Sequence, residues 1–104
     1  MTQKEWNKLS FFEQMSNIDG EVEHMIRAHQ KYIAGDSKED NGFFYLDKID
    51  KLVRMTLHSP ENASKGYRGI ELFDEIGELR KYLAGEYDDD YVRNYWNQYT
   101  NAIS

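Results

Sequence analysis

Hydrophobic positions recur every three or four residues along most of the chain, and this spacing predicts helices. The first long helix is expected over residues 10–34. Its hydrophobic stripe consists of Met15, Ile18, Val22, Met25, His29 and Tyr32, widened by Phe12, Ile26 and Ile33. Two capping-box patterns, Thr2 with Glu5 and Ser10 with Glu13, come before this stripe. A short helical turn should therefore lead into the main helix.

Three further helices are expected, and each has its own boundary signal. The second covers residues 41–58, because Pro60 cannot continue it. The third covers residues 67–84 and ends before Gly85, which suits a left-handed stop. The fourth opens with the aspartates at 88–90, which favour the positive end of a helix dipole, and it runs to Ile103.

The stripes of these three helices complete one hydrophobic core. They are Phe43, Leu46, Ile49, Val53 and Leu57 in the second, Leu72, Ile76, Leu79 and Leu83 in the third, and Val92, Tyr95, Trp96, Tyr99 and Ile103 in the fourth. The connections between the helices are polar, including residues 59–65. Four helices joined in this way predict an all-α, antiparallel up-down four-helix bundle, with residues 1–104 as a single domain.

The composition of the chain excludes several classes of function. The chain has 104 residues, no cysteine and 13 basic against 19 acidic residues, for a formal charge of -6. Disulfides, cysteine-bound zinc and thiol nucleophiles are excluded, and the charge has the wrong sign for tracking nucleic-acid phosphates. No apolar run is long enough for a membrane span, and the first residues do not form a secretory signal. We expect a cytoplasmic protein with no cofactor and with neither membrane nor nucleic acid as its partner.

A sequence pattern that covers most of the chain resembles a family of small, uncharacterised prokaryotic helical proteins. The opening pattern is Trp6-x-x-Leu9-Ser10-x-x-Glu13-Gln14-x-x-Asn17-Ile18-x-x-Glu21-Val22-Glu23, and the likeness closes at Tyr95-Trp96-x-x-Tyr99. The resemblance implies a bacterial origin and a helical fold, and it implies no assigned activity.

The third helix carries a row of acids. Glu71, Asp74, Glu75 and Glu78 lie on one helix face, and carboxylates at this spacing suit a Mg²⁺ site. Residues 72–79 also resemble the acidic helix of all-α nucleoside triphosphate pyrophosphatases. That resemblance implies a Mg²⁺-dependent nucleotide phosphohydrolase, with Asp47 or Asp50 opposite the row. The alternative, which we prefer, is an acidic face in contact with solvent.

One histidine falls on a hydrophobic stripe. His29 lies in register with Met15 and Val22, so we expect a buried polar residue whose ring bonds to a tyrosine. Titration near neutral pH could instead make it a switch.

The fourth helix has more aromatic residues than one narrow stripe can bury. Tyr91, Tyr95, Trp96 and Tyr99 are therefore candidates for an interaction surface, since tyrosine and tryptophan are enriched in protein interfaces. Core tyrosines with hydroxyls reaching solvent are the alternative. The chain is expected to be a protein-protein interaction or regulatory module without catalysis, either a homodimer or bound to another protein. An accessory protein of a phage or mobile element, with an acidic binding surface, remains a further alternative.

Overall fold

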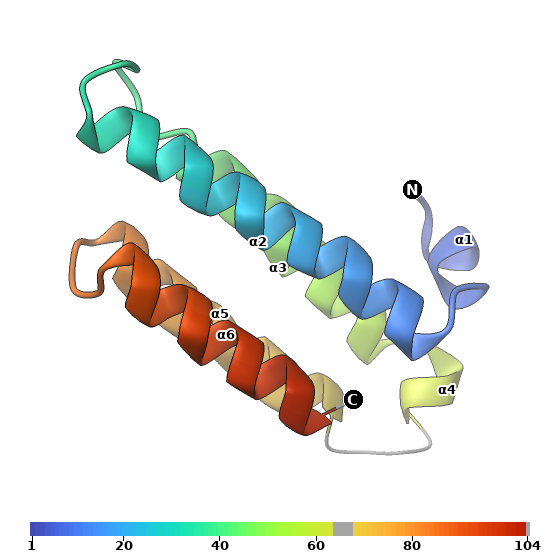
Figure 1. Cartoon of the computed structure of the whole chain (residues 1–104). Coiled ribbons are helices and arrows are strands. Elements are labelled where there is room, and N and C mark those ends of the chain that lie inside the picture. The colour runs from blue at the N-terminus through green and yellow to red at the C-terminus, as the bar shows by residue number, and fades with distance from the viewer. Residues whose placement is uncertain (64–67, 104) are drawn as a thin grey trace.

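The chain is built from helices. The computed structural model describes residues 1–63 and 68–103, with the backbone alone at 61, 63, 68–73, 102 and 103. Its helices are α1 (Gln3–Asn7), α2 (Phe11–Ile33), α3 (Gly42–Leu57), α4 (Pro60–Ala63), α5 (Arg68–Leu83) and α6 (Asp89–Ile103). The described part of the chain contains no strand, which confirms the predicted all-α class (Figure 1). Within these residues, no helix combines the length and the hydrophobicity that crossing a bilayer requires.

Most predicted helix boundaries are confirmed to within a residue. Ser10 caps α2 in both directions, since its hydroxyl accepts the Glu13 N–H at 3.1 Å and its own N–H donates to the Glu13 carboxylate at 3.2 Å. Gly35 follows α2 with a φ of +83°, as expected for a left-handed stop. The prediction for residues 59–65 was wrong in part, because Pro60 does not only end α3 but also begins α4. Proline is well tolerated in a first helical turn, where its missing N–H needs no partner.

The long helices pack in sequence order. In Figure 1, α2 lies beside α3 and α5 lies beside α6, and close contacts also join α3 to α5. Side-chain hydrogen bonds also connect α6 to α2 through Gln30 with Asp89, Arg93 with Glu23 and Trp96 with Asp19. The residues buried between the helices are Met15, Ile18, Val22, Met25, Ile26, Leu46, Ile49, Val53, Ile76, Leu79, Tyr82, Leu83, Val92 and Trp96.

The predicted stripes were too wide at the helix ends. Phe12, Ile33 and Phe43 are 73%, 70% and 48% exposed, although the sequence pattern placed them on core-facing stripes. All three lie in the first or last turn of a helix, where fewer neighbouring helices remain to cover them. Conversely, Tyr82 is only 1% exposed, although the predicted stripe of its helix, which contains Leu79 and Leu83, does not include it.

A buried polar cluster attaches the short helices to the long ones. The Trp6 indole N–H donates to the Thr56 hydroxyl at 2.9 Å, which joins α1 to α3. Gln14, 1% exposed, donates to the Trp6 carbonyl at 2.9 Å and accepts from Asn62 of α4 at 3.0 Å. The Gln14 amide also donates to the Ser59 hydroxyl at 3.2 Å. The cluster therefore stabilises α1 and α4 through hydrogen bonds that are shielded from water.

Candidate functional site

Three tyrosine rings form a continuous column that begins in the loop before α6 and continues along one side of that helix, and we call Tyr87, Tyr91 and Tyr95 the tyrosine face. A spacing of four residues places Tyr91 and Tyr95 on one side of α6. The rings of Tyr87 and Tyr91 have centroids 4.5 Å apart, and those of Tyr91 and Tyr95 are 6.3 Å apart and nearly parallel, at 14°. Tyr91, in the middle, is 50% exposed. An ordered aromatic column with an exposed centre is a surface that can pack against another protein.

The loop before α6 fixes where this column begins. Gly85 has a φ of +88°, which ends α5 and turns the chain back toward it. The Asp88 carboxylate accepts the backbone N–H of Tyr91 at 2.7 Å, so this acid caps the first turn of α6. The predicted role of the aspartates at the start of this helix is thus performed by the first of them.

Acids of α5 hold the outer two tyrosine hydroxyls. The Tyr87 hydroxyl donates to Glu78 at 2.6 Å, and this hydrogen bond together with burial raises the pKa of Tyr87 to about 12. The same bond lowers the pKa of the Glu78 carboxyl. Burial, followed by a hydrogen bond to Glu75, raises the pKa of Tyr95. Both rings are therefore fixed in orientation before any partner arrives.

Trp96 does not share this surface. It is 4% exposed, and its indole N–H donates to Asp19 of α2 at 2.7 Å. Burial raises the pKa of the Asp19 carboxyl, and the bond from Trp96 offsets part of that rise. Tyr99 is half-buried, with its ring 5.8 Å from that of Trp96. Trp96 thus packs at the α2–α6 contact with Tyr99 beside it, and the tyrosine face contains Tyr91 and Tyr95 of the four candidates.

The predicted acidic row is divided among several contacts. Glu75 and Glu78 bind tyrosine hydroxyls, and Glu78 also lies 3.4 Å from the Lys81 ammonium. Asp74 is exposed, and the side chain of Glu71 lies outside the described residues. Hydrogen bonds and ion pairs therefore already occupy two of the four carboxylates.

Asp47 and Asp50, the two acids expected opposite this row, have different surroundings. Asp50 and Asp74 line one groove of about 280 Å³ between α3 and α5, but Arg54 and Arg80 line it too. The Arg54 guanidinium lies 3.2 Å from the Asp50 carboxylate. Asp47 is exposed on α3. Among the described residues, no three side chains of His, Asp or Glu come together as a metal ion would require.

His29 is buried, and its partner is an acid. The side chain of His29 is 8% exposed, and its Nδ1 atom lies 2.6 Å from Asp40, whose side chain is 9% exposed. The sequence pattern pointed to a tyrosine as the hydrogen-bond partner. A tyrosine, Tyr82, does contact the imidazole, but through its ring, at a centroid distance of 4.8 Å. Tyr82 instead donates its hydroxyl to Asp89, and burial together with that bond raises the pKa of Tyr82.

No pattern in the sequence predicts the hydrogen bonds that fix this site. Glu75 and Glu78 were recognised as a row of acids, whereas their tyrosine partners lie on the next helix. Asp40 lies in the polar loop between α2 and α3, where no periodicity applies.

Comparison with models of known protein families found no match, and searches of characterised proteins and of solved structures found no similar chain. The resemblance to small prokaryotic helical proteins therefore remains a prediction from the sequence.

Proposed function

We propose that this chain is a protein-protein interaction module that acts without catalysis and that its partner is a second copy of itself. The observation that carries the proposal is the tyrosine face, an aromatic column with hydroxyls already bonded to Glu75 and Glu78. Rings that are ordered beforehand lose little conformational entropy on binding. Tyrosine is also among the residues that contribute most to interfaces.

Charge along α6 favours one way of pairing two copies. Residues 86–90 contain four acids, and residues 97–101 contain no charged side chain. In a parallel pair the acidic segments would repel one another. A two-fold axis with the helices antiparallel puts each acidic segment beside a neutral one, and the two copies then use the same patch. The axis then passes between positions 93 and 94 of each copy, with Tyr91 and Tyr95 on either side of it.

The finer arrangement and the location of the chain belong to the same proposal. We infer that α2, α3, α5 and α6 form an antiparallel four-helix bundle, supported by the contacts of α3 with both α2 and α5 and by the hydrogen bonds from α6 to α2. We also assign the chain to the bacterial cytoplasm, where a sequence without cysteine is common.

Sedimentation equilibrium over a range of concentrations tests the proposal. The wild-type chain should dimerise reversibly. Tyr91→Ala should weaken dimerisation by about tenfold or more, because the change removes a central ring from both copies. Tyr32→Ala, which removes a tyrosine that is 41% exposed on α2, is the matched control and should leave the dimer intact.

Two results would overturn the proposal. One is a wild-type chain that stays monomeric at its highest soluble concentration. The other is a dimer weakened equally by both substitutions. Thermal unfolding of each variant checks that neither substitution has acted by disrupting the fold. Little disruption is expected from Tyr91→Ala, because within the described part of the chain the Tyr91 ring contacts the rings of Tyr87 and Tyr95 alone.

A further inference from the structure

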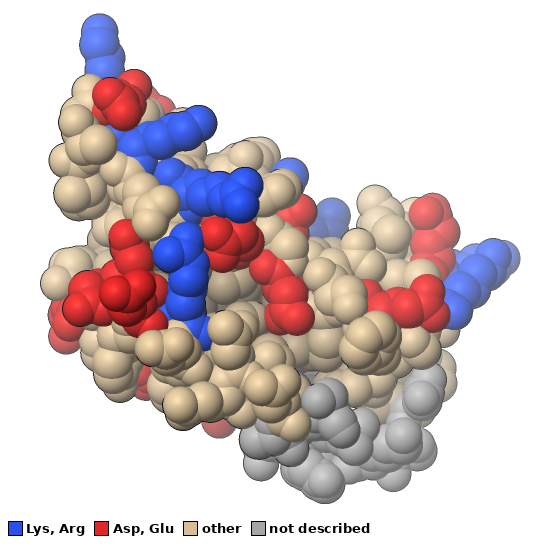
Figure 2. Space-filling view, in the orientation of Figure 1, with Lys and Arg blue, Asp and Glu red and all other residues tan. Residues whose placement is uncertain are grey.

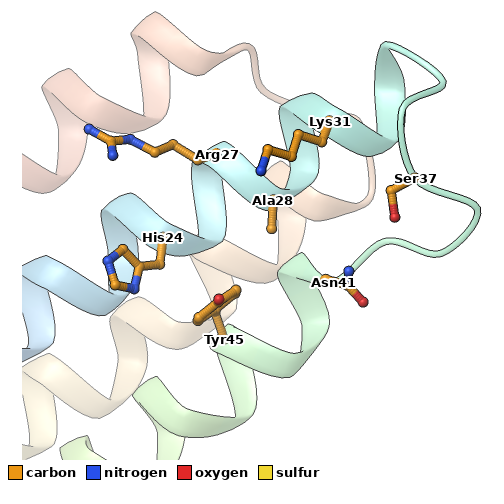
Figure 3. A pocket seen from close by; sticks show the side chains of 7 residues that line it. All are labelled: His24, Arg27, Ala28, Lys31, Ser37, Asn41 and Tyr45. Carbon is orange, nitrogen blue, oxygen red and sulfur yellow. The ribbon is translucent and has the colours of Figure 1, made fainter.

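A groove lined by basic residues lies on the opposite side of α2 from its core-facing stripe. His24, Arg27, Ala28 and Lys31 of α2, Ser37 and Asn41 of the following loop, and Tyr45 of α3 line it, and it encloses about 280 Å³. Figure 3 shows Lys31 extending back along α2 toward Ala28, whose methyl group fills little of the space. We call these seven residues the basic groove.

Positive charge is concentrated here, although the chain as a whole carries a charge of -6. Figure 2 shows Lys and Arg side chains gathered over the end of α2 that leads into the loop to α3. An anion approaching this end of α2 would thus find several cations within reach.

Two acids beside the groove are already engaged by other groups. Asp40 is turned inward, where it bonds to His29 at 2.6 Å and accepts the Gly42 N–H at 2.9 Å. Glu23 is engaged chiefly by Arg93, at 2.8 Å, and its contact with Arg27 is longer, at 3.4 Å. The Arg27 side chain remains 69% exposed. Among the described residues, the Lys31 ammonium has no ion-pair partner within 4.0 Å.

Neutral donors complete the lining. The Asn41 amide and the Tyr45 hydroxyl make no hydrogen bond to any described side chain or backbone group. The ring of Tyr45 is held against His24, with centroids 5.5 Å apart at 75°, so its hydroxyl is kept at the groove. The Ser37 hydroxyl donates to the Glu39 carbonyl at 2.7 Å and can only accept from a ligand. Cations beside neutral N–H and O–H donors can together bind phosphate oxygens.

We infer that the basic groove binds the phosphate group of a small phosphate monoester. Arg27 and Lys31 supply the charge, Asn41 and Tyr45 supply neutral hydrogen bonds, and His24 adds a ring N–H. The volume of the groove lies at the small end of the range for ligand sites, which suits a single phosphate with a sugar or nucleoside attached. A nucleic-acid strand is disfavoured, because it needs a continuous basic track.

An NMR titration of the full chain tests this inference with three probes: inorganic phosphate, ribose 5-phosphate and adenosine monophosphate. Ionic strength is held constant with sodium chloride, which also serves as the ligand-free reference. We expect saturable shifts of the backbone amide signals of residues 24–31 and 41–45 with at least one of the two monoesters. Comparison of the two monoesters shows whether the nucleobase contributes.

The variant that tests the groove is the double substitution Arg27→Gln and Lys31→Gln. It should lower the affinity for the monoester by about tenfold or more, because it removes two charge-assisted hydrogen bonds. Lys4→Gln with Lys8→Gln removes the same charge from exposed positions on and just after α1, and affinity should be retained. Both pairs are exposed, so thermal unfolding should be nearly unchanged in each variant.

Four results would overturn the inference. They are the absence of saturable shifts with either monoester, binding of inorganic phosphate alone, an equal loss of affinity in the two double variants, and tighter binding of a single-stranded oligonucleotide than of the mononucleotide. The inference does not depend on dimerisation. Tyr91→Ala should bind the monoester as the wild-type chain does, so the failure of one proposal is distinguishable from the failure of the other.

Discussion

The imidazole of His29 and the carboxylate of Asp40 form a buried pair, with Nδ1 and Oδ2 2.6 Å apart. The other oxygen of Asp40 accepts the Gly42 N–H at 2.9 Å, so one side chain connects α2 to the first residue of α3. Asp40 thereby performs the capping role that Asn41 does not, since the Asn41 side chain makes no capping bond. The loop between α2 and α3 is held in place from within the protein.

Replacing Asp40 should destabilise the chain strongly. Asp40→Ala leaves both the His29 ring nitrogen and the Gly42 N–H buried without this acceptor, and we expect the free energy of unfolding to fall by about 2–3 kcal/mol. Urea denaturation measures this change. Asp47→Ala, at an exposed position of α3, is the control and should cost less than about 0.5 kcal/mol. Equal effects of the two substitutions would show that the buried pair contributes little.

Alanine substitutions at Gly42 and at Gly20 should change the free energy of unfolding in opposite directions. A Cβ atom at Gly42 would lie 2.7 Å from the Leu83 Cδ2 atom and 2.8 Å from the Asp40 Oδ1 atom. Gly42→Ala should therefore lower the free energy of unfolding by about 1–3 kcal/mol. Gly20 has nothing within 4 Å of its Cβ position and lies inside α2. Gly20→Ala should raise the free energy of unfolding by about 0.5–1 kcal/mol.

Thermal unfolding of both glycine variants gives the comparison directly. In a chain of this length, 1 kcal/mol corresponds to a shift in Tm of about 4–8 °C. The two variants should move to opposite sides of the wild-type Tm. A rise in Tm for Gly42→Ala would mean that Leu83 and Asp40 move aside at no cost.

The buried polar cluster around Gln14 should also be sensitive to substitution. Gln14→Ala removes the acceptor of Asn62 and the donor to the Trp6 carbonyl. We expect the free energy of unfolding to fall by about 2–3 kcal/mol, because the Asn62 amide and the Trp6 carbonyl stay buried without these partners. Gln98→Ala, on the exposed side of α6, is the matched control and should be nearly neutral. Hydrogen exchange should show whether α1 and α4 open first in the Gln14 variant.

Alkaline titration should distinguish Tyr87, whose hydroxyl is bonded to Glu78, from tyrosines with an ordinary pKa. The pKa of Tyr87 is raised to about 12 in the folded chain from an ordinary value of 10.0. A raised pKa means that the folded state holds this proton more tightly. The protonated Tyr87 hydroxyl therefore contributes fully to the free energy of unfolding below about pH 10. This contribution is lost as the pH rises from about 10 to 12.

The ultraviolet absorbance of tyrosinate follows this titration. Glu78→Gln removes the charged acceptor, so the pKa of Tyr87 should fall toward its ordinary value, and one tyrosine should ionise earlier. Tyr87→Phe should remove the same late-titrating group altogether. If Glu78→Gln leaves the titration curve unchanged, the hydrogen bond is not the cause of the raised pKa.

The long helices could be predicted from the sequence because each buries one side. The capping box at Ser10 and Glu13 fixed the start of α2, and Gly35 and Gly85 marked the ends of α2 and α5. Periodicity could not show how far along each helix the neighbours extend. Phe12 and Phe43 therefore appeared to belong to the core, although they lie in end turns that are left uncovered.

The candidate site was only partly predictable. The sequence analysis named Tyr91 and Tyr95, whose rings stack, but it did not name Tyr87, which lies in the loop before α6. The hydrophobic stripe of the last helix already directed Trp96 toward the core, where it is 4% exposed, but no pattern within α6 reveals its hydrogen bond to Asp19. The bonds from Glu75 and Glu78 to tyrosines likewise join two helices and become visible only once those helices are packed.

The two tryptophans of this chain are both buried, and each donates its indole N–H to a different contact: Trp6 to Thr56 between α1 and α3, and Trp96 to Asp19 between α6 and α2. Each indole is thus a natural fluorescent reporter for one helix–helix contact. Replacing either one by phenylalanine leaves a chain with a single emitter, so fluorescence can follow the detachment of α1 and the detachment of α6 as separate events.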